Sequence, residues 1–376
     1  MSGIYIHIPF CKKICYYCDF HFSLNLSHKE SFIEALEKEI ELQKDYLNDK
    51  TIETIYFGGG TPSILSSLEI NQIFSQLEQH FDLSNVGEIT LEANPDDLSS
   101  DYLLALKQTR INRLSIGIQS FFDEDLILMN RRHTAIDAYT CVENALKTGF
   151  CNITIDLMYG LPNFSLERWK KNIAIALSLQ INHISAYHLT IEKQTAFNKF
   201  QKDGKIILPT EELSESQYHT LVDILKEHGF VHYEISNFAR FGFYATHNSN
   251  YWKQKSYLGL GPSAHSFNGS SRQWNISNNL KYISSLETGV LPFEIEKLSE
   301  KERFNEYILT SLRTIWGVDI AYIKNNFPQK YCSIFIAKME GYVHLGYVLQ
   351  NDLSISLTNK GMFISDSIIS DVFVTD

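Results

Sequence analysis

The chain has 376 residues, of which 44% are hydrophobic and 20% are charged, and its net charge is −11. These values indicate a globular protein with a real core, long enough for one large domain and a smaller one. A polyphosphate backbone needs clustered basic residues, and no run of lysine or arginine occurs, so nucleic acid is not an expected partner. No apolar stretch reaches the ~20 residues that span a bilayer, and no signal-peptide pattern is present. We therefore expect a cytoplasmic protein with at most peripheral membrane contact.

The first 240 residues alternate strand and helix patterns. Short β-type runs recur at residues 3–8, 52–57, 88–93, 113–119, 152–158 and 183–190. Amphipathic helical patterns follow, among them residues 134–147, 166–179 and 211–228. Two helices are expected to begin with a capping box, formed by Ser27 with Glu30 and by Ser66 with Glu69. Because parallel strands require crossover connections, six βα units predict a parallel sheet with helices outside.

Polar residues and glycines recur where the predicted strands end. They are Gly58–Gly60, Glu92, Gln119 and Asp156. An open sheet also fits the order of elements, but a (β/α) barrel places its chemistry at the carboxyl ends of its strands. The pattern therefore favours an α/β fold with a partial (β/α)6 barrel.

The alternation stops after about residue 240. The segment 241–269 is rich in glycine, asparagine, serine and aromatic residues and is expected to be loop-like. From about residue 280 the pattern is helical, with short strands near the end. We predict a core barrel over residues 1–240 and a smaller, mainly helical C-terminal domain over 241–376, part of which resembles a winged helix. The acidic chain favours substrate or protein docking by that part over DNA binding.

Three cysteines, Cys11, Cys15 and Cys18, follow the first strand with the spacing C-x3-C-x2-C. Six cysteines in a chain of this length do not suggest a disulfide framework, and the other three are scattered and expected to be structural. A cubane cluster usually has four thiolate ligands, so three would leave one iron open to a substrate. The alternative is a structural zinc site, with His21 close enough in sequence to be the fourth ligand.

The run Gly-Gly-Gly-Thr-Pro at residues 58–62 comes one βα unit after the three cysteines. Its bare backbone groups could approach a ligand closely, although a glycine run alone is weak evidence. In this position it favours the cluster over zinc.

The cysteines and the glycine run resemble the radical S-adenosylmethionine superfamily, and the surrounding sequence resembles its coproporphyrinogen-oxidase-like branch. The resemblance runs over nearly the whole chain and rests also on Tyr-Ile-His-Ile-Pro-Phe-Cys, Ser-Ile-Gly-Ile-Gln-Ser-Phe and Asp-Leu-Met-Tyr-Gly-Leu-Pro. It implies that Cys11, Cys15 and Cys18 bind a [4Fe–4S] cluster whose open iron chelates S-adenosylmethionine. The cofactor contacts that it implies are Tyr5, Tyr17, Gly59, Gly60, Thr61, Glu92, Gln119, Arg131 and Asp156.

The chemistry of these contacts agrees with the ligand, because carboxylates can bind an amine and hydroxyls while a guanidinium forks onto a carboxylate. Each residue also has a plain structural alternative. Glu92 could cap a helix, Gln119 could pack in the core, and Arg131 could be a solvated charge. The shared position at strand ends favours a functional role for Glu92, Gln119 and Asp156, whereas Arg131 depends on the resemblance.

Two members of the branch must be separated: an oxygen-independent oxidase that decarboxylates coproporphyrinogen III, and a chaperone that binds haem and passes it to acceptor proteins. The oxidase carries an additional cysteine where this chain has Phe20. It also has an N-terminal extension, for which the ten residues before Cys11 leave no room. Finally, residues 247–252 match the His-Asn-x-x-Tyr-Trp pattern typical of the chaperone.

This last motif suits haem, because imidazole is a common axial ligand and aromatic rings offer flat apolar surface. The resemblance implies haem contacts at His247, Asn248, Tyr251 and Trp252. The alternative for His247 is a hydrogen-bonded structural role. His265 and His7 are further candidates, and packing is expected for His7.

We therefore predict a protein with a [4Fe–4S] cluster and S-adenosylmethionine that carries haem to an acceptor haemoprotein and receives electrons from a donor. Decarboxylation of coproporphyrinogen is not expected, but an oxidase remains the alternative function. The sequence leaves open whether cleavage of S-adenosylmethionine is part of the function.

Overall fold

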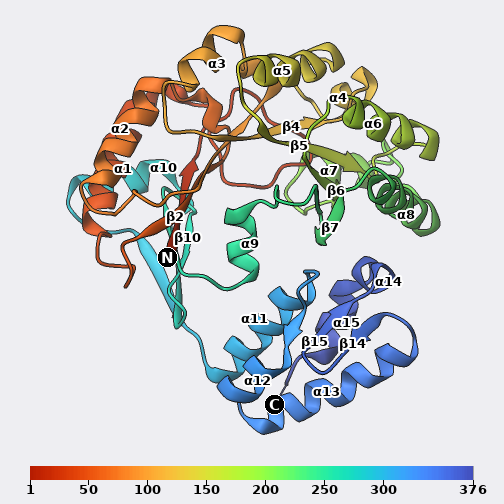
Figure 1. Ribbon diagram of the computed structural model, residues 1–376. Helices are drawn as coiled ribbons and strands as arrows, with labels where there is room; N and C mark the ends of the chain where they lie inside the picture. The colour runs from red at the N-terminus through yellow and green to blue at the C-terminus, as the bar shows by residue number, and fades with distance from the viewer. Residues whose placement is uncertain (376) are drawn as a thin grey trace.

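The structure, a computed structural model, describes residues 1–375 as a curved sheet with helices on its outer face and a small domain below its open side (Figure 1). Six parallel strands pair in chain order: β1 (Ser2–Ile8), β2 (Ile52–Gly59), β3 (Glu88–Ala93), β4 (Arg113–Gln119), β5 (Asn152–Tyr159) and β6 (His183–His188). β1 and β6 do not pair with each other, so the barrel stays open. The predicted partial (β/α)6 barrel is confirmed.

Successive side chains of a strand point to opposite faces of the sheet, so one set packs in the core and the other faces the concave side. On β1, Ile4, Ile6 and Ile8 are fully buried in the hydrophobic core. Tyr5 and His7, between them, lie on the concave side, where Tyr5 stacks on Tyr56 of β2 with ring centroids 6.1 Å apart. The concave side is therefore lined with polar and aromatic groups.

Eight helices among the described residues follow the strands of the barrel. They are α1 (Lys29–Leu42), α2 (Ser67–Glu78), α3 (Ser100–Leu106), α4 (Asp123–Leu128), α5 (Ala135–Lys147), α6 (Leu166–Ser178), α7 (Ala196–Lys202) and α8 (Glu211–Glu227).

The structure confirms one of the two predicted capping boxes. At α2 the amide of Glu69 donates to Ser66 Oγ over 3.3 Å, and the amide of Ser66 donates to Glu69 Oε2 over 2.8 Å. The box predicted at Ser27 is wrong. There Asn25 Oδ1 accepts from the Ser27 amide at 3.0 Å and caps a short 3₁₀ turn, after which α1 begins without a side-chain cap.

The sheet continues past residue 240. Within the segment expected to be a loop lie α9 (Thr246–Trp252), β9 (Tyr257–Leu260) and β10 (His265–Phe267), so that expectation is wrong. β9 pairs in parallel with β1, and β10, β11 (Ser271–Asn275) and β12 (Phe293–Lys297) extend the sheet from it, with α10 (Asn279–Glu287) between the last two. At the other edge lie β8 (Asn237–Ala239) and β7 (Val231–Glu234). The domain division at residue 240 stays a prediction.

The small domain consists of α11 (Glu300–Leu312), β13 (Val318–Asp319), α12 (Ile320–Asn326), α13 (Gln329–His344), β14 (Val348–Gln350), β15 (Ser354–Leu357), α14 (Asn359–Phe363) and α15 (Ser365–Val372). Its three strands form a separate antiparallel sheet in the order β13-β15-β14. Over residues 1–375, the structure contains no helix with the length and apolar character needed to cross a membrane.

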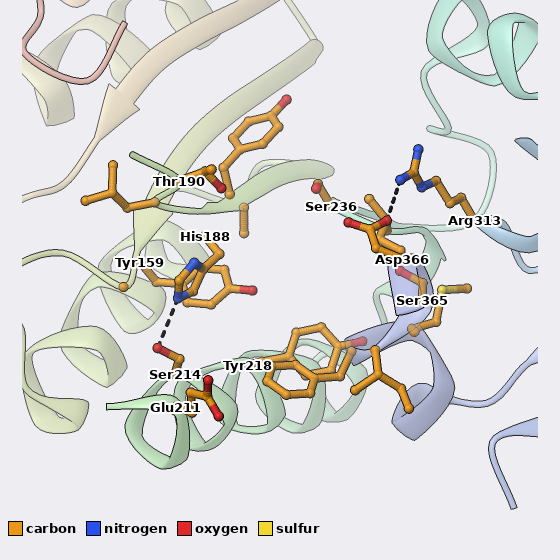
Figure 2. A pocket seen from close by; sticks show the side chains of 18 of the residues that line it. Tyr159, His188, Thr190, Glu211, Ser214, Tyr218, Ser236, Arg313, Ser365 and Asp366 are labelled. Carbon is orange, nitrogen blue, oxygen red and sulfur yellow. Dashed lines mark hydrogen bonds and ion pairs between the residues drawn. The ribbon is translucent and has the colours of Figure 1, made fainter. Parts of the chain in front are cut away.

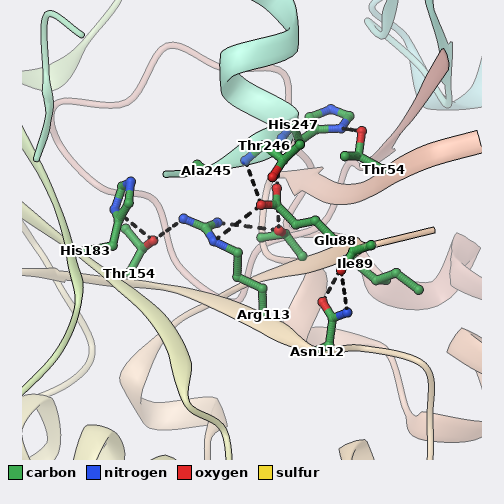
Figure 3. A network of polar contacts seen from close by, with 12 residues as sticks. Thr54, Glu88, Ile89, Asn112, Arg113, Thr154, His183, Ala245, Thr246 and His247 are labelled. Carbon is green, nitrogen blue, oxygen red and sulfur yellow. Dashed lines mark hydrogen bonds and ion pairs between the residues drawn. The ribbon is translucent and has the colours of Figure 1, made fainter. Parts of the chain in front are cut away.

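A buried ion pair lies at the amino-terminal end of the barrel strands (Figure 3). Arg113 is 2% exposed, its Nε forms an ion pair with Glu88 Oε2 at 4.0 Å, and its Nη2 donates a hydrogen bond to Thr154 Oγ1. Glu88 in turn accepts the amides of Thr246 and His247 at 2.7 and 2.9 Å. These amides open α9 and would otherwise lack partners. The pair therefore ties β3 and β4 to α9.

We expect Arg113→Met to lower the free energy of unfolding by about 3–5 kcal/mol, because the buried Glu88 carboxylate would lose its counter-charge. Urea denaturation followed by circular dichroism measures the change. Arg110→Met is the matched control, since Arg110 forms a partly exposed ion pair with Glu78 and should leave the midpoint nearly unchanged. Equal midpoints for the two variants would contradict a stabilising role of the buried pair.

Candidate functional site

The loop after β1 carries Cys11, Cys15 and Cys18, referred to below as the cysteine triad. All three are free thiols with intermediate exposure. Backbone hydrogen bonds hold the loop in place: the Cys11 amide donates to Ser23 O at 3.0 Å, and the Tyr16 amide donates to Met129 O at 3.1 Å. The loop is therefore fixed both to itself and to the end of α4.

Two side chains donate hydrogen bonds to sulfur. Thr61 Oγ1 lies 3.4 Å from Cys11 Sγ, and Arg131 Nη1 lies 3.4 Å from Cys15 Sγ. Arg131 Nη2 also donates to Asn94 Oδ1 and to Gly117 O, both at 2.6 Å. Donors of this kind tune the potential of iron–sulfur clusters. Arg131 thus joins the cysteine triad to the ends of β3 and β4.

Asn94 was missed in the sequence analysis. Its Nδ2 donates to Thr61 Oγ1 over 3.2 Å, so it connects two residues that contact the thiols, Thr61 and Arg131. The sequence could have indicated it, because Asn94 directly follows β3 and is a polar residue at a strand end, like Glu92.

The donor set fits an iron–sulfur cluster. Burial raises the pKa of the Cys11 thiol and raises that of Cys18 to about 11, so both would stay protonated without a cation to stabilise their thiolates. Across residues 1–375 no three His, Cys, Asp or Glu side chains converge on the position of a single metal ion. A cubane does not need such convergence, because each thiolate binds a different iron.

His21, the residue considered as a fourth zinc ligand, has another partner. Its Nε2 lies 2.6 Å from Asn279 Oδ1 of α10. Its neighbour His7 packs as expected: the ring is 5% exposed, with Nε2 2.9 Å from His21 O. His7 therefore links the cysteine loop to β1, and His21 links it to α10.

The glycine run has a steric reason of its own. Gly59 has φ +112°, and a Cβ there would lie 2.9 Å from the His7 ring. A Cβ on Gly60 would lie 2.7 Å from Phe10 O, just before the cysteine triad. Only glycine lets the end of β2 pass so close to the loop. Contact of Gly59 and Gly60 with a cofactor stays a prediction.

Two carboxyl groups lie on the concave side of the barrel. Glu92 Oε1 accepts a hydrogen bond from Tyr56 Oη at 2.7 Å. Burial raises the pKa of Glu92 to about 7, and burial together with the Glu92 charge raises the pKa of Asp156 to about 7. Both groups can therefore exchange a proton or accept hydrogen bonds near neutral pH.

The remaining predicted cofactor contacts lie around these two groups. Tyr17 Oη is 3.4 Å from Arg131 Nη1, beside the cysteine triad. Gln119 adopts φ +68°, and its amide lies against Gly117, where a Cβ would be 3.0 Å from Gln119 Nε2. Tyr5 lies over Tyr56, next to Glu92. The fold thus gathers the predicted cofactor contacts of strands β1 to β5 near the carboxyl ends of these strands. The roles of these residues stay predictions.

His247 lies elsewhere, at the opposite end of the strands (Figure 3). It is 2% exposed, with Nδ1 2.8 Å from Thr54 Oγ1 and Nε2 2.8 Å from Tyr251 Oη. Its ring also stacks on Tyr56 with centroids 5.1 Å apart. Both nitrogens of His247 are therefore engaged. An axial bond to haem iron would require this arrangement to open.

The other predicted haem contacts divide between two surroundings. Tyr251 is bound to His247, and Asn248 is half-buried on α9. Trp252, at the end of α9, reaches a cavity at the small domain. His265 is exposed and stacks on Trp274, with centroids 6.0 Å apart.

This cavity has a volume of about 780 Å³ and lies between the ends of β5 and β6, the start of α8, and α14 and α15 (Figure 2). Its walls include Tyr159, Tyr187, His188, Tyr218, Trp252 and Phe363. Burial, together with the charge of Asp156, raises the pKa of Tyr187. In the sheet register Asp156 pairs with Ser185, two residues before Tyr187, so the cavity adjoins the carboxyl pair. No sequence pattern indicates this cavity, because its residues come from segments far apart in the chain.

Residues 5–175 match the family model of the radical SAM superfamily. The haem chaperone HemW of Bacillus subtilis is 33% identical over 98% of both chains, and HemW of Lactococcus lactis is 33% identical over 100% of this chain and 98% of its own. A mitochondrial radical S-adenosyl methionine domain-containing protein 1 of Danio rerio is 34% identical over 70% of this chain and 60% of its own.

The fold is similar to that of coproporphyrinogen III oxidase (HemN) of Escherichia coli, with a TM-score of 0.84 and 23% identity over 99% of this chain and 90% of that one. At this identity the likeness concerns the fold alone. It extends through the small domain as well as the barrel.

We expect the cluster-free protein to lose stability as the pH rises from about 4.5 to about 7, in part through Glu92. Its pKa is raised on folding, so the folded state holds the proton more tightly and is favoured at low pH. Glu92→Gln should therefore flatten the fall in the urea midpoint between pH 5 and pH 8. The exposed Glu287→Gln is the control, and an unchanged slope in Glu92→Gln would refute the assignment.

Proposed function

Because the chain belongs to the HemW family within the radical SAM superfamily, we propose that it binds haem and transfers it to acceptor haemoproteins. One observation carries this proposal: the likeness to haem chaperones spans the whole chain, including the small domain that shares the cavity with the barrel. A location in the cytoplasm and an electron donor as a second partner are parts of the same proposal.

The cysteine triad is the proposed site of a [4Fe–4S] cluster with one iron left open for S-adenosylmethionine. When bound, such a cluster supplies an electron that can cleave S-adenosylmethionine. Thr61 and Arg131 would stabilise the thiolates through their hydrogen bonds to sulfur. Glu92 and Asp156, both half-buried on the concave side, would accept hydrogen bonds from the amine or hydroxyls of the cofactor.

Phe20 supports a chaperone over a decarboxylase. It occupies the position at which the oxidase is expected to carry a further cysteine, and its side chain is 70% exposed on the cysteine loop. A phenyl ring can neither donate a proton nor bind a metal there. We therefore propose that the chain does not decarboxylate coproporphyrinogen.

For the haem motif we propose two roles. Trp252 contacts the haem from the cavity wall. His247 acts as a positioning residue, because its bonds to Thr54 and Tyr251 fix α9 between the barrel and the small domain. In both roles the motif serves haem binding.

Two parallel anaerobic incubations of reconstituted, reduced protein test the function. One contains coproporphyrinogen III with S-adenosylmethionine and is analysed for protoporphyrinogen. The other contains haem and is followed by absorbance, then mixed with a haem-free haemoprotein. Tight haem binding and transfer without decarboxylation is the expected result. Multiple turnovers to protoporphyrinogen would replace the chaperone function with oxidase activity.

Cys15→Ala should abolish the charge-transfer absorbance of the cluster and reduce bound iron from about four per chain, because no thiolate remains for one iron of the cubane. Iron, sulfide and zinc analysis after anaerobic reconstitution measures this. The exposed Cys151, outside the triad, provides the control variant Cys151→Ala, which should keep its iron. Stoichiometric zinc in the unmodified protein would instead indicate a structural zinc site.

A further inference from the structure

His188 ends β6 at the wall of the cavity and is exposed there (Figure 2). Its Nε2 is 3.0 Å from Ser214 Oγ, and its ring meets Tyr159 edge-on with centroids 5.2 Å apart. A Cβ on Gly160 would lie 2.5 Å from His188 Nε2, so glycine at that position makes room for the ring. The imidazole is thus held in a defined place beside open volume, and freeing Nε2 breaks one hydrogen bond to a hydroxyl.

The walls of the cavity are largely aromatic. Tyr187 is 42% exposed, Trp252 comes from α9, and Phe363 of α14 packs on Tyr218 with centroids 5.3 Å apart. Flat aromatic surfaces from the barrel and the small domain suit a planar apolar ligand. The volume of about 780 Å³ is within the usual range for sites that enclose an organic ligand.

The two ends of the cavity differ in charge (Figure 2). Glu211 lies at the end of His188, one turn before Ser214 on α8. Arg313 lies at the other end, where it pairs with Asp366. The Asp366 side chain is 81% exposed, so it can turn into solvent and leave the guanidinium to another carboxylate. A ligand with a cationic centre and carboxylate side chains matches this polarity.

We propose that this cavity is the haem site of the chain, with His188 as an axial ligand to iron and Arg313 binding a propionate. The inference rests on the proposed function and deepens it, since it names the site. To bind iron through Nε2, His188 would give up its hydrogen bond to Ser214 at the cavity wall. To bind iron, His247 would have to break one of its two hydrogen bonds, to Thr54 or to Tyr251, inside a buried network. Ser236 and Ser365 are hydroxyl groups on the same wall as Arg313 and can hydrogen-bond the carboxylates.

The first test titrates the reconstituted full chain with ferric haem and, separately, with metal-free protoporphyrin IX. His188→Ala should shift the Soret band and weaken haem binding by about tenfold or more, which corresponds to about 1.4 kcal/mol. Its affinity for protoporphyrin IX, which has no iron to coordinate, should not change. The control is His228→Ala, an exposed histidine on the far end of α8 that does not line the cavity.

The second test addresses the carboxylate end and does not depend on the folding of the histidine variant. Arg313→Gln should weaken binding of both haem and protoporphyrin IX, but not that of protoporphyrin IX dimethyl ester, which has no carboxylates to bind. Equal loss for the ester would show a merely structural role of Arg313 and overturn the assignment.

The outcomes also separate this inference from the proposed function. If the unmodified chain binds no haem, the function itself fails. If it binds and transfers haem while His188→Ala and Arg313→Gln behave as the unmodified chain, the function stands and the site is elsewhere. A Soret shift in His247→Ala with none in His188→Ala would assign the axial ligand to His247 and overturn the inference.

Discussion

The Arg113–Glu88 pair is the constraint on which both ends of the barrel depend. An open barrel lacks the strand that would close it, and α9 enters at its amino-terminal end. Glu88 accepts hydrogen bonds from the first amides of α9, and the positive charge of Arg113 offsets the free-energy cost of burying the Glu88 carboxylate. From there His247 stacks on Tyr56, whose hydroxyl donates to Glu92 at the cofactor end. A continuous series of contacts therefore runs from the ion pair to the candidate cofactor site.

The cofactor end uses a second arginine in a comparable way. Arg131 satisfies Asn94 and Gly117 at the ends of β3 and β4 and also donates to Cys15 Sγ. One guanidinium thereby fixes the strand ends and supplies positive charge where anionic sulfur is needed. In the sequence, Arg131 lies beyond a helix and not at a strand end, so its prediction as a cofactor contact depends on the resemblance. Its place in the site depends on the fold, which brings Asn94 and Gly117 beside it.

Local rules and topology made much of this predictable. Short β-type runs indicate all six barrel strands, and the Ser66 capping box depends only on residues of its own turn. Parallel strands gather their carboxyl ends, so the strand-end positions of Glu92 and Asp156 predict that the two carboxyl groups lie near each other. Their contact with a cofactor stays a prediction. The failures have nonlocal causes. Asn25 caps the turn that Ser27 was expected to cap. Strand β9 forms because it can pair with the edge of β1 that no other strand of the barrel occupies. Burial of His247 depends on Thr54, far away in sequence.

The cavity includes the end of β6, and the neighbouring strand β5 carries Asp156 of the candidate cofactor site. This proximity explains how a fold with radical SAM machinery can serve a carrier. Tyr187 lines the cavity, and burial together with the charge of Asp156 raises its pKa; the next residue, His188, contacts α8. Both residues line the cavity, and Tyr187 lies on the same face of the sheet as Asp156 of the neighbouring strand β5. Trp252 adds the end of α9, whose start is anchored at Glu88. Haem in the proposed site would therefore touch both elements that border the barrel interior, and no separate relay between the two sites is required.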